Sequence, residues 1–198
     1  MMKNITPKKF GFSDIEKRHI LKSWIAISLA FAIAFSPYPS FATSLLVSAL
    51  TIGFAFVLHE VAHKYLAIKY RCNAEFRANN NMLILMLIVS LFGIIFAAPG
   101  AVQISGHVTK DKYGKIALAG PLTNLGLALI FLVILLSGLG NFSLTLFRFG
   151  FLINAWIALF NMIPLFGFDG HKIMHWNKSV FYTMLILTII LVSISQYV

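Results

Sequence analysis

Long apolar runs alternate with short polar segments along most of this chain. A helix needs about 20 apolar residues to cross the hydrocarbon core of a bilayer. Runs that approach or exceed this length cover residues 21–35, 41–68, 82–98, 116–136, 147–164 and 180–198. Prolines or glycines follow several of them, as is typical where helices end. The pattern predicts an all-α polytopic membrane protein with about five to six transmembrane segments.

Composition agrees with this interpretation and limits the domain organisation. Of the 198 residues, 59% are hydrophobic and 11% are charged, against roughly 25% charged in an average soluble domain. The apolar runs take up most of the length. We therefore expect residues 1–198 to form a single membrane-embedded domain, with a polar basic tail over residues 1–20 and no appended soluble domain. Cys72 is the lone cysteine, which excludes an intrachain disulfide and a cysteine-based zinc knuckle.

The charge is strongly positive, because 16 Lys and Arg stand against 6 Asp and Glu, which gives a net charge of +10. A nucleic-acid-binding protein carries its basic residues on a folded polar face. Here they flank the apolar runs, as in the cytoplasmic loops of membrane proteins. We therefore expect a lipid bilayer around the protein and no nucleic-acid partner. The expected location is the cell membrane, with several passes and the N-terminus in the cytoplasm.

The run over residues 82–98 can either cross the membrane or turn back within it. The positive-inside rule compares the two topologies. If the run turns back, every Lys and Arg except Arg148 lies on the cytoplasmic side; if it crosses, the basic residues divide between the two sides. Charge therefore favours a re-entrant element around residues 82–105, with its turn near Gly93. The residues leave open whether this element is a β-hairpin or a broken helix.

Two histidines and a glutamate interrupt the run 41–68 near its end, in the sequence His59-Glu60-Val61-Ala62-His63. Residues four apart on a helix lie on one face, so both imidazoles can bind one metal ion while Glu60 reaches a metal-bound water. Ionisable groups inside a span are costly and are functional candidates for that reason. This HExxH motif predicts His59 and His63 as metal ligands, usually of zinc, and Glu60 as the catalytic residue.

Asp169 is the strongest candidate for the third protein ligand that a catalytic zinc requires. Asp14 and Glu16 lie in the tail. Glu75 and Asp111 lie in basic loops, where solvated ion pairs are expected. Asp169 instead directly follows an apolar run. In the re-entrant topology this run ends at the same depth as the two histidines, whereas in the crossing topology it ends on the opposite side of the membrane. Charge and ligand closure therefore favour the same topology.

Further motifs accompany these residues: Asn161-x-x-Pro164, Asp169-Gly170, Gly120-Pro121-x-x-Asn124 and the Ala-Pro-Gly-Ala-Val stretch 98–102. Together with an HExxH sequence in an apolar run, they resemble the site-2 protease family of intramembrane zinc metalloproteases, peptidase family M50. The resemblance covers most of the chain. It departs from the family at Ala62, a position often occupied by Gly, and at Phe168, where Leu usually precedes Asp-Gly.

The resemblance implies that the two histidines and Asp169 hold one Zn²⁺ per chain, that Glu60 is the general base, and that Asn161 and Asn124 contact the substrate. We therefore expect a zinc metalloendopeptidase that hydrolyses peptide bonds within or near transmembrane segments of membrane proteins, as in regulated intramembrane proteolysis. The alternative is a membrane transporter of metal ions or small solutes that uses the same His and Asp side chains. His171 and His175 form a weaker alternative ligand pair. The pattern predicts no oligomeric state.

Overall fold

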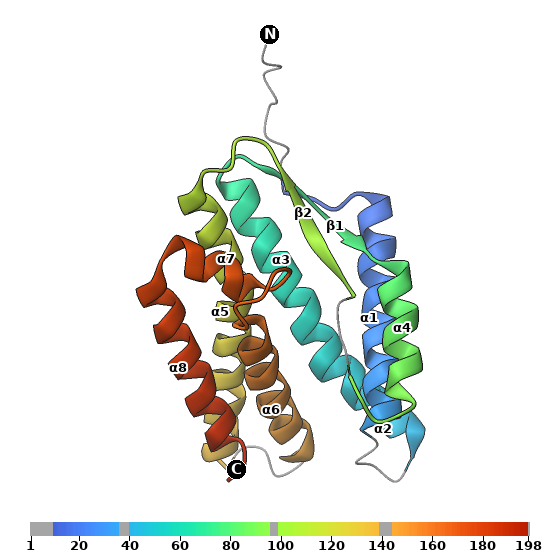
Figure 1. Ribbon diagram of the computed structural model, residues 1–198. Helices are drawn as coiled ribbons and strands as arrows, with labels where there is room; N and C mark the ends of the chain where they lie inside the picture. Colours follow the sequence, from blue (N-terminus) through green and yellow to red (C-terminus); the bar gives the residue numbers. More distant parts are fainter. Residues whose placement is uncertain (1–9, 36–39, 96–98, 139–143, 198) are drawn as a thin grey trace.

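The computed structural model describes residues 10–35, 40–95, 99–138 and 144–197. Figure 1 shows most helices running along one long axis, with α3 between α1 on one side and α5 on the other, and with the two strands and α7 toward the same end. In chain order the elements are α1 (Asp14–Ala34), α2 (Phe41–Ser48), the π-helix η1 (Ala49–Gly53), α3 (Phe54–Lys69), β1 (Asn73–Ala78), α4 (Asn80–Ser90), β2 (Gly100–Ser105), α5 (Lys110–Leu136), α6 (Leu144–Asn161), α7 (Asp169–Trp176) and α8 (Lys178–Ile194).

Within the described residues, three helical stretches are long and apolar enough to cross a membrane: Phe41–Lys69, Lys110–Leu136 and Leu144–Asn161. The first of them joins α2, η1 and α3 without a break. The helices α4 and α8 are apolar but shorter. The mainly helical fold is thus confirmed, and three helices are capable of spanning a membrane. The count of five to six spans stays a prediction.

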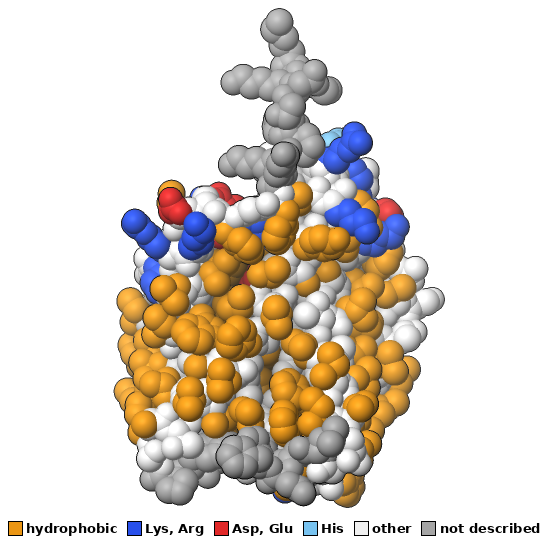
Figure 2. Space-filling view, turned by 180° about the vertical axis from the view of Figure 1, so that it is seen from behind, with side chains coloured by type: hydrophobic (Ala, Val, Ile, Leu, Met, Phe, Trp, Pro, Cys, Tyr) orange, Lys and Arg blue, Asp and Glu red, His pale blue; other side chains and the backbone are white. Residues whose placement is uncertain are grey.

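The surface has a broad apolar belt with charged side chains beyond one end of it. Figure 2 shows Lys and Arg gathered at that end. Exposed leucine, isoleucine and valine side chains of α5 and α8 contribute to the belt, among them Leu129, Val133, Ile186 and Ile190. A soluble monomer rarely exposes so large an apolar surface. The belt agrees with membrane association, while the orientation in the membrane stays a prediction.

Trp24 of α1 packs against the long helical stretch that carries the HExxH motif. Its indole N–H donates to Ala49 O at 3.2 Å, at the start of the π-helix. Gly53 lies directly against the ring, since a Cβ there would stand 2.4 Å from Trp24 Nε1. The glycine therefore allows α1 to pack closely where α3 begins.

Asn79 and Pro99, which are 20 residues apart in the sequence, lie next to each other in the fold. The backbone N–H of Asn79 donates to Pro99 O at 3.1 Å. After α4 the direction changes in a turn that includes Gly93, whose φ is 74°, a value that glycine adopts without strain. The predicted turn near Gly93 is confirmed. Residues 96–98 of this element, and with them Ala98 of the 98–102 motif, lie outside the described residues.

The element around residues 82–105 is a helix followed by a strand, and not a β-hairpin. Strand β2 pairs antiparallel with β1, from Asn73 opposite Ser105 to Ala78 opposite Gly100. The prediction that Glu75 lies in a basic loop is wrong, because this residue belongs to β1. The charged residues of β1 carry little strand preference of their own. The strand exists because β2, distant in sequence, supplies partners for its backbone.

The prediction that Glu16 belongs to a polar tail is also wrong, because the residue lies in the first turn of α1. The residue is fully buried in α1. Its Oε2 forms an ion pair with Lys64, the residue after His63 on α3. Its Oε1 accepts the backbone N–H of Phe76 in β1 at 2.9 Å. One carboxylate therefore joins α1, α3 and β1 beside the HExxH motif.

Replacing Glu16 with glutamine is expected to lower the free energy of unfolding by about 3–5 kcal/mol, because the buried Lys64 ammonium loses its counter-charge. Asp14→Asn is the matched control, since Asp14 forms an exposed ion pair with Lys17 and such pairs contribute little. Denaturant unfolding in detergent micelles measures both variants. Equal stability of the two would contradict the role assigned to Glu16.

Candidate metal centre

Three side chains from two helices meet in the interior. His59 and His63 lie four residues apart on α3, and Asp169 is the first residue of α7. The two histidine Nε2 atoms are 3.0 Å apart. Asp169 Oδ2 lies 3.3 Å from His59 Nε2 and 2.9 Å from His63 Nε2. All three side chains are buried, and the structure thus brings together the three residues predicted as metal ligands.

The hydrogen bonds of the two rings determine which atoms face this meeting point. His59 Nδ1 bonds Asn124 Oδ1 at 2.5 Å, and His63 Nδ1 bonds Ile116 O at 2.7 Å. Both partners are oxygen acceptors, so each Nδ1 donates and carries the proton. The Nε2 atom of each ring then points toward the other ring and toward the carboxylate, and it is the nitrogen that can offer a lone pair to a metal ion. Lone pairs this close repel one another unless a cation lies between them.

These donors fit zinc in both type and spacing. Tetrahedral ligand atoms about 2.0–2.1 Å from a zinc ion lie roughly 3.3 Å from one another, close to the three separations in this cluster. Two imidazoles and one carboxylate also form a known donor set of catalytic zinc, which leaves a fourth position open. Asp169 Oδ1 accepts Lys172 Nζ at 2.9 Å, so the carboxylate offers its other oxygen to the ion.

Asp169 is ionised despite its burial. Burial by itself raises the pKa of this carboxyl, but the imidazoles of His63 and His59 and the ammonium of Lys172 hold that pKa well below its usual range. The side chain is therefore an anion at neutral pH, as a carboxylate metal ligand must be.

Glu60 lies next to the ligand cluster and faces strand β2. Its Oε2 accepts the backbone N–H of Val102 at 3.2 Å. Val102 stands opposite Phe76 in the β1–β2 ladder, and the N–H of Phe76 is taken by Glu16. The two N–H groups therefore point away from each other, that of Val102 toward Glu60 and that of Phe76 toward Glu16. The edge of β2 that does not pair with β1 faces Glu60, whose role as general base stays a prediction.

Gly120 of α5 makes room for the metal ligands. A Cβ on this residue would lie 2.4 Å from both His59 Nε2 and His63 Nε2, closer than a carbon atom can approach. Pro121 follows it inside the helix, where proline removes one backbone hydrogen bond. The Gly-Pro element seen in the sequence thus has a physical role, because it brings the bare backbone of α5 against the cluster.

Gly120→Ala is expected to displace the two imidazoles and to weaken zinc binding by on the order of 100-fold, at the upper end of the effect of losing an outer-shell contact. Gly126→Ala is the control on the same helix, since a Cβ at that position meets no atom within 4 Å. Competition with a chromogenic chelator measures both affinities. Wild-type affinity in Gly120→Ala would show that the backbone does not approach the ligands as described.

The two asparagines predicted to contact substrate have different surroundings. Asn124 is fully buried and bonds His59, one of the predicted metal ligands. Asn161, half-buried at the end of α6, donates from Nδ2 to Ile157 O at 3.0 Å. A substrate contact of either residue stays a prediction. The rings of His171 and His175 contact each other with centroids 4.2 Å apart and planes tilted by 41°, outside the ligand cluster.

The two acids predicted to lie in basic loops form ion pairs as expected, but neither lies in a loop, because Glu75 belongs to β1 and Asp111 to the first turn of α5. Glu75 pairs with Arg77 at 2.6 Å, and Asp111 pairs with Lys115 at 2.8 Å. Neither belongs to the His-His-Asp cluster. The choice of Asp169 over these acids is therefore consistent with the geometry.

Two residues that bond the side chains of the centre or their partners are not among those predicted from the sequence. Asn154 of α6 accepts a hydrogen bond from Asn124 Nδ2 at 3.1 Å, and Lys172 bonds the second oxygen of Asp169. Asn154 is a polar residue inside the apolar run 147–164, and this interruption is a signal that could have found it. Lys172 follows Asp169 by three residues, a spacing at which ion pairs form on a helix.

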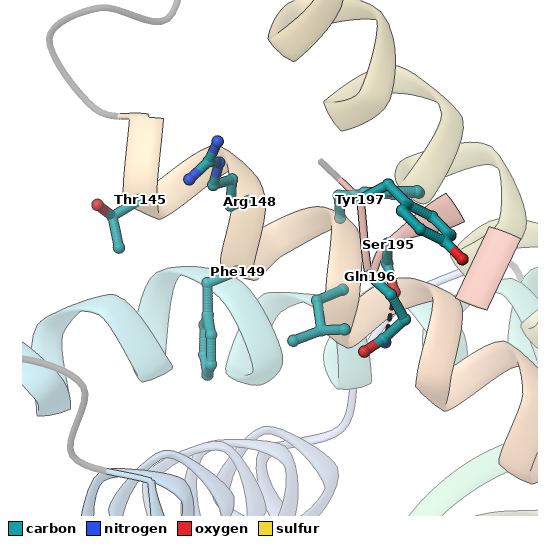
Figure 3. A pocket seen from close by; sticks show the side chains of 8 residues that line it. Thr145, Arg148, Phe149, Ser195, Gln196 and Tyr197 are labelled. Atoms are coloured by element: carbon teal, nitrogen blue, oxygen red, sulfur yellow. Dashed lines mark hydrogen bonds between the residues drawn. The ribbon is translucent and has the colours of Figure 1, made fainter. Parts of the chain in front are cut away.

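A separate cavity of about 400 Å³ lies away from the centre, between the start of α6 and the residues after α8. Figure 3 shows its lining, which includes Thr145, Arg148, Phe149, Ser195, Gln196 and Tyr197. These α6 residues lie at the opposite end of the helix from Asn161, which leads toward α7. The cavity contains none of the predicted metal ligands and takes no part in the arrangement described above.

Fold and site together define a class: a mainly helical protein with membrane-capable helices and a buried HExxH-type candidate metal centre. The chain is 42% identical over 175 residues to a protein of Methanocaldococcus jannaschii named "Putative zinc metalloprotease MJ0611", and the match covers 86% of this chain and 89% of that protein. The chain belongs to the family of that protein, which supports a metalloprotease function and zinc as the metal. No family model and no solved structure matches the chain.

Proposed function

We propose that this protein is an intramembrane zinc metalloprotease of the site-2 protease type, which hydrolyses peptide bonds within or near transmembrane segments of other membrane proteins. The observation that carries the proposal is the buried cluster of His59, His63 and Asp169, in which three lone pairs converge. The HExxH residues belong to the stretch Phe41–Lys69, which is able to cross a membrane. A hydrolytic site at that position acts on a substrate segment that is itself in the bilayer.

The chemistry divides between the metal and the side chains. Bound zinc supplies a Lewis acid that polarises the scissile carbonyl and makes water a nucleophile near neutral pH. The two histidines and Asp169 would hold the ion, a donor set typical of catalytic zinc. Glu60 takes a proton from the attacking water and then donates it to the leaving amine. The N–H of Val102, which donates to Glu60 Oε2, orients that carboxylate beforehand.

We propose that the substrate backbone pairs with the edge of β2 that does not pair with β1. A helical substrate shields its carbonyls in its own hydrogen bonds, so the segment must unwind before it is cleaved. The N–H of Val102 points away from β1 and is held by Glu60, so this edge of β2 lies beside the general base. An extended segment that pairs with the other outward-facing backbone groups of β2 would add a strand there. Backbone pairing of this kind suits substrates that have few polar side chains.

The position of the site in the fold supports access of water from the cytoplasm. Lys64 and Lys69 follow the HExxH motif, and Lys172 follows Asp169. Basic residues of this kind mark the cytoplasmic side by the positive-inside rule. We therefore place the cluster near the cytoplasmic face of the cell membrane, with the N-terminus on the same side and the chain crossing several times.

The test uses the purified protein in liposomes with a model single-span substrate. Zinc-loaded protein is expected to cut the substrate, chelation to stop the reaction, and added zinc to restore it. Cleavage of an unstructured soluble peptide with no cleavage of the single-span substrate would contradict the intramembrane assignment. Zinc uptake into empty liposomes, followed by a trapped dye, without any cleavage would favour the transporter instead.

A further inference from the structure

We propose that Asn154 is a positioning residue of the metal centre, which acts through Asn124 to hold His59 in the tautomer whose Nε2 faces the metal. The proposal rests on the zinc site of the proposed function. It adds a residue of a third helix, α6, to a centre whose ligands come from α3 and α7. The residue touches neither metal nor substrate in the arrangement described, so its effect is transmitted by hydrogen bonds.

A path of hydrogen bonds runs from Asn154 through Asn124 to His59. Its first step fixes the orientation of the Asn154 amide. The side chain is 1% exposed, and its Nδ2 donates to Gly150 O, four residues earlier on α6, at 2.8 Å. A carbonyl oxygen accepts and never donates. The nitrogen of the amide must therefore face Gly150, which leaves Oδ1 as the acceptor on the side of α5.

The second step fixes the amide of Asn124 in the opposite sense. Its Nδ2 donates to Asn154 Oδ1 at 3.1 Å and to Ala55 O at 3.3 Å. A flipped amide would place its oxygen against these two acceptors, where it would be repelled twice. The oxygen of Asn124 therefore faces His59 Nδ1, 2.5 Å away, and that nitrogen must carry the proton. The lone pair of His59 lies on Nε2 as a result.

The two metal-ligand histidines differ in what orients them. His63 Nδ1 donates to Ile116 O, and a backbone carbonyl in a helix does not reverse donor and acceptor. His59 Nδ1 instead bonds the side-chain amide of Asn124. When such an amide rotates by half a turn, its oxygen and nitrogen exchange places, and the acceptor is replaced by a donor. Asn154 Oδ1 and Ala55 O together oppose that rotation of Asn124, and the bond to Asn154 is the shorter of the two. A fixed orientation of this kind supports metal binding, because outer-shell partners set the tautomer and the basicity of a ligand histidine.

The experiment compares Asn154→Leu with Thr188→Val, each of which removes one buried polar group. Thr188 is fully buried on α8 and its hydroxyl bonds Leu185 O, so it lies outside the path. Asn154→Leu is expected to weaken zinc binding by about 10–100-fold, measured by chelator competition, whereas Thr188→Val keeps the wild-type affinity. Asn154→Ser serves if the leucine variant does not fold, because serine bonds the carbonyl four residues earlier but is too short to reach Asn124.

A second readout separates this inference from the zinc proposal. In metal-free protein labelled with ¹⁵N-histidine, the two ring nitrogens report the tautomer of His59 directly. Wild-type protein is expected to show the proton on Nδ1, and Asn154→Leu or Asn154→Ser to show a mixture of both tautomers. An unchanged His59 tautomer together with an unchanged zinc affinity would overturn the inference. A wild-type tautomer on Nδ1 in a protein that binds no zinc would refute the zinc proposal and leave the hydrogen-bonded path intact.

Discussion

Glu60→Gln is expected to lower the rate of substrate cleavage by about 10²–10⁴-fold, the range for loss of a general acid–base group. Glutamine fits the same space and accepts the Val102 N–H through its oxygen, but it takes no proton from water. Zinc content is expected to stay at the wild-type level, because Glu60 is not one of the three clustered ligands. The measurement pairs metal analysis of the purified variant with the rate of cleavage of a single-span substrate in liposomes.

Two results for Glu60→Gln would contradict this assignment. Cleavage at the wild-type rate would exclude Glu60 as the general base. Loss of zinc together with activity would make Glu60 a metal ligand instead. Glu75→Gln is the matched control, because Glu75 is an acid of β1 that pairs with Arg77 outside the cluster, and both its zinc content and its rate are expected to match the wild type.

Asp169→Asn is expected to weaken zinc binding by more than about 100-fold, beyond the 10–100-fold effect of losing an outer-shell partner. The amide keeps the size of the side chain but removes the anionic oxygen that faces both imidazoles. It also leaves the Lys172 ammonium without its carboxylate partner, which adds an uncompensated positive charge beside the ion. Chelator competition on the purified protein in detergent measures the change.

Asp111→Asn is the control for this experiment, because Asp111 forms an exposed ion pair with Lys115 and takes no part in the cluster. The two variants carry the same change of charge. Stoichiometric zinc of wild-type affinity in Asp169→Asn would exclude Asp169 as the third ligand, whatever its position in the structure.

The metal cluster could be predicted from sequence because its residues are rare in their surroundings. His59, Glu60 and His63 interrupt an apolar run, and Asp169 ends another, so each stands out against its neighbours. The helical spacing of the two histidines is a local property. A topological argument also favours Asp169, because the three residues are expected at the same depth if the run 82–98 turns back.

Features that depend on distant partners could not be predicted in the same way. The burial of Glu16 depends on Lys64 and on the backbone of β1, neither of which is near it in sequence. The strand β1 depends on β2 for its hydrogen bonds. Asn154 is a single amide in an apolar helix, where such residues commonly join helices. Its connection to His59 becomes visible only when three helices are placed together.

The most direct test of the central claim is mass spectrometry of the products that the zinc-loaded protein makes from a single-span substrate in liposomes, with the reaction run in H₂¹⁸O. Hydrolysis inside or beside the apolar segment is expected to leave one ¹⁸O in the new C-terminal carboxyl group of a fragment that ends there. Chelated protein is expected to yield no such fragment. An intact substrate in the presence of bound zinc, or cuts confined to parts of the substrate far from the bilayer, would contradict the account.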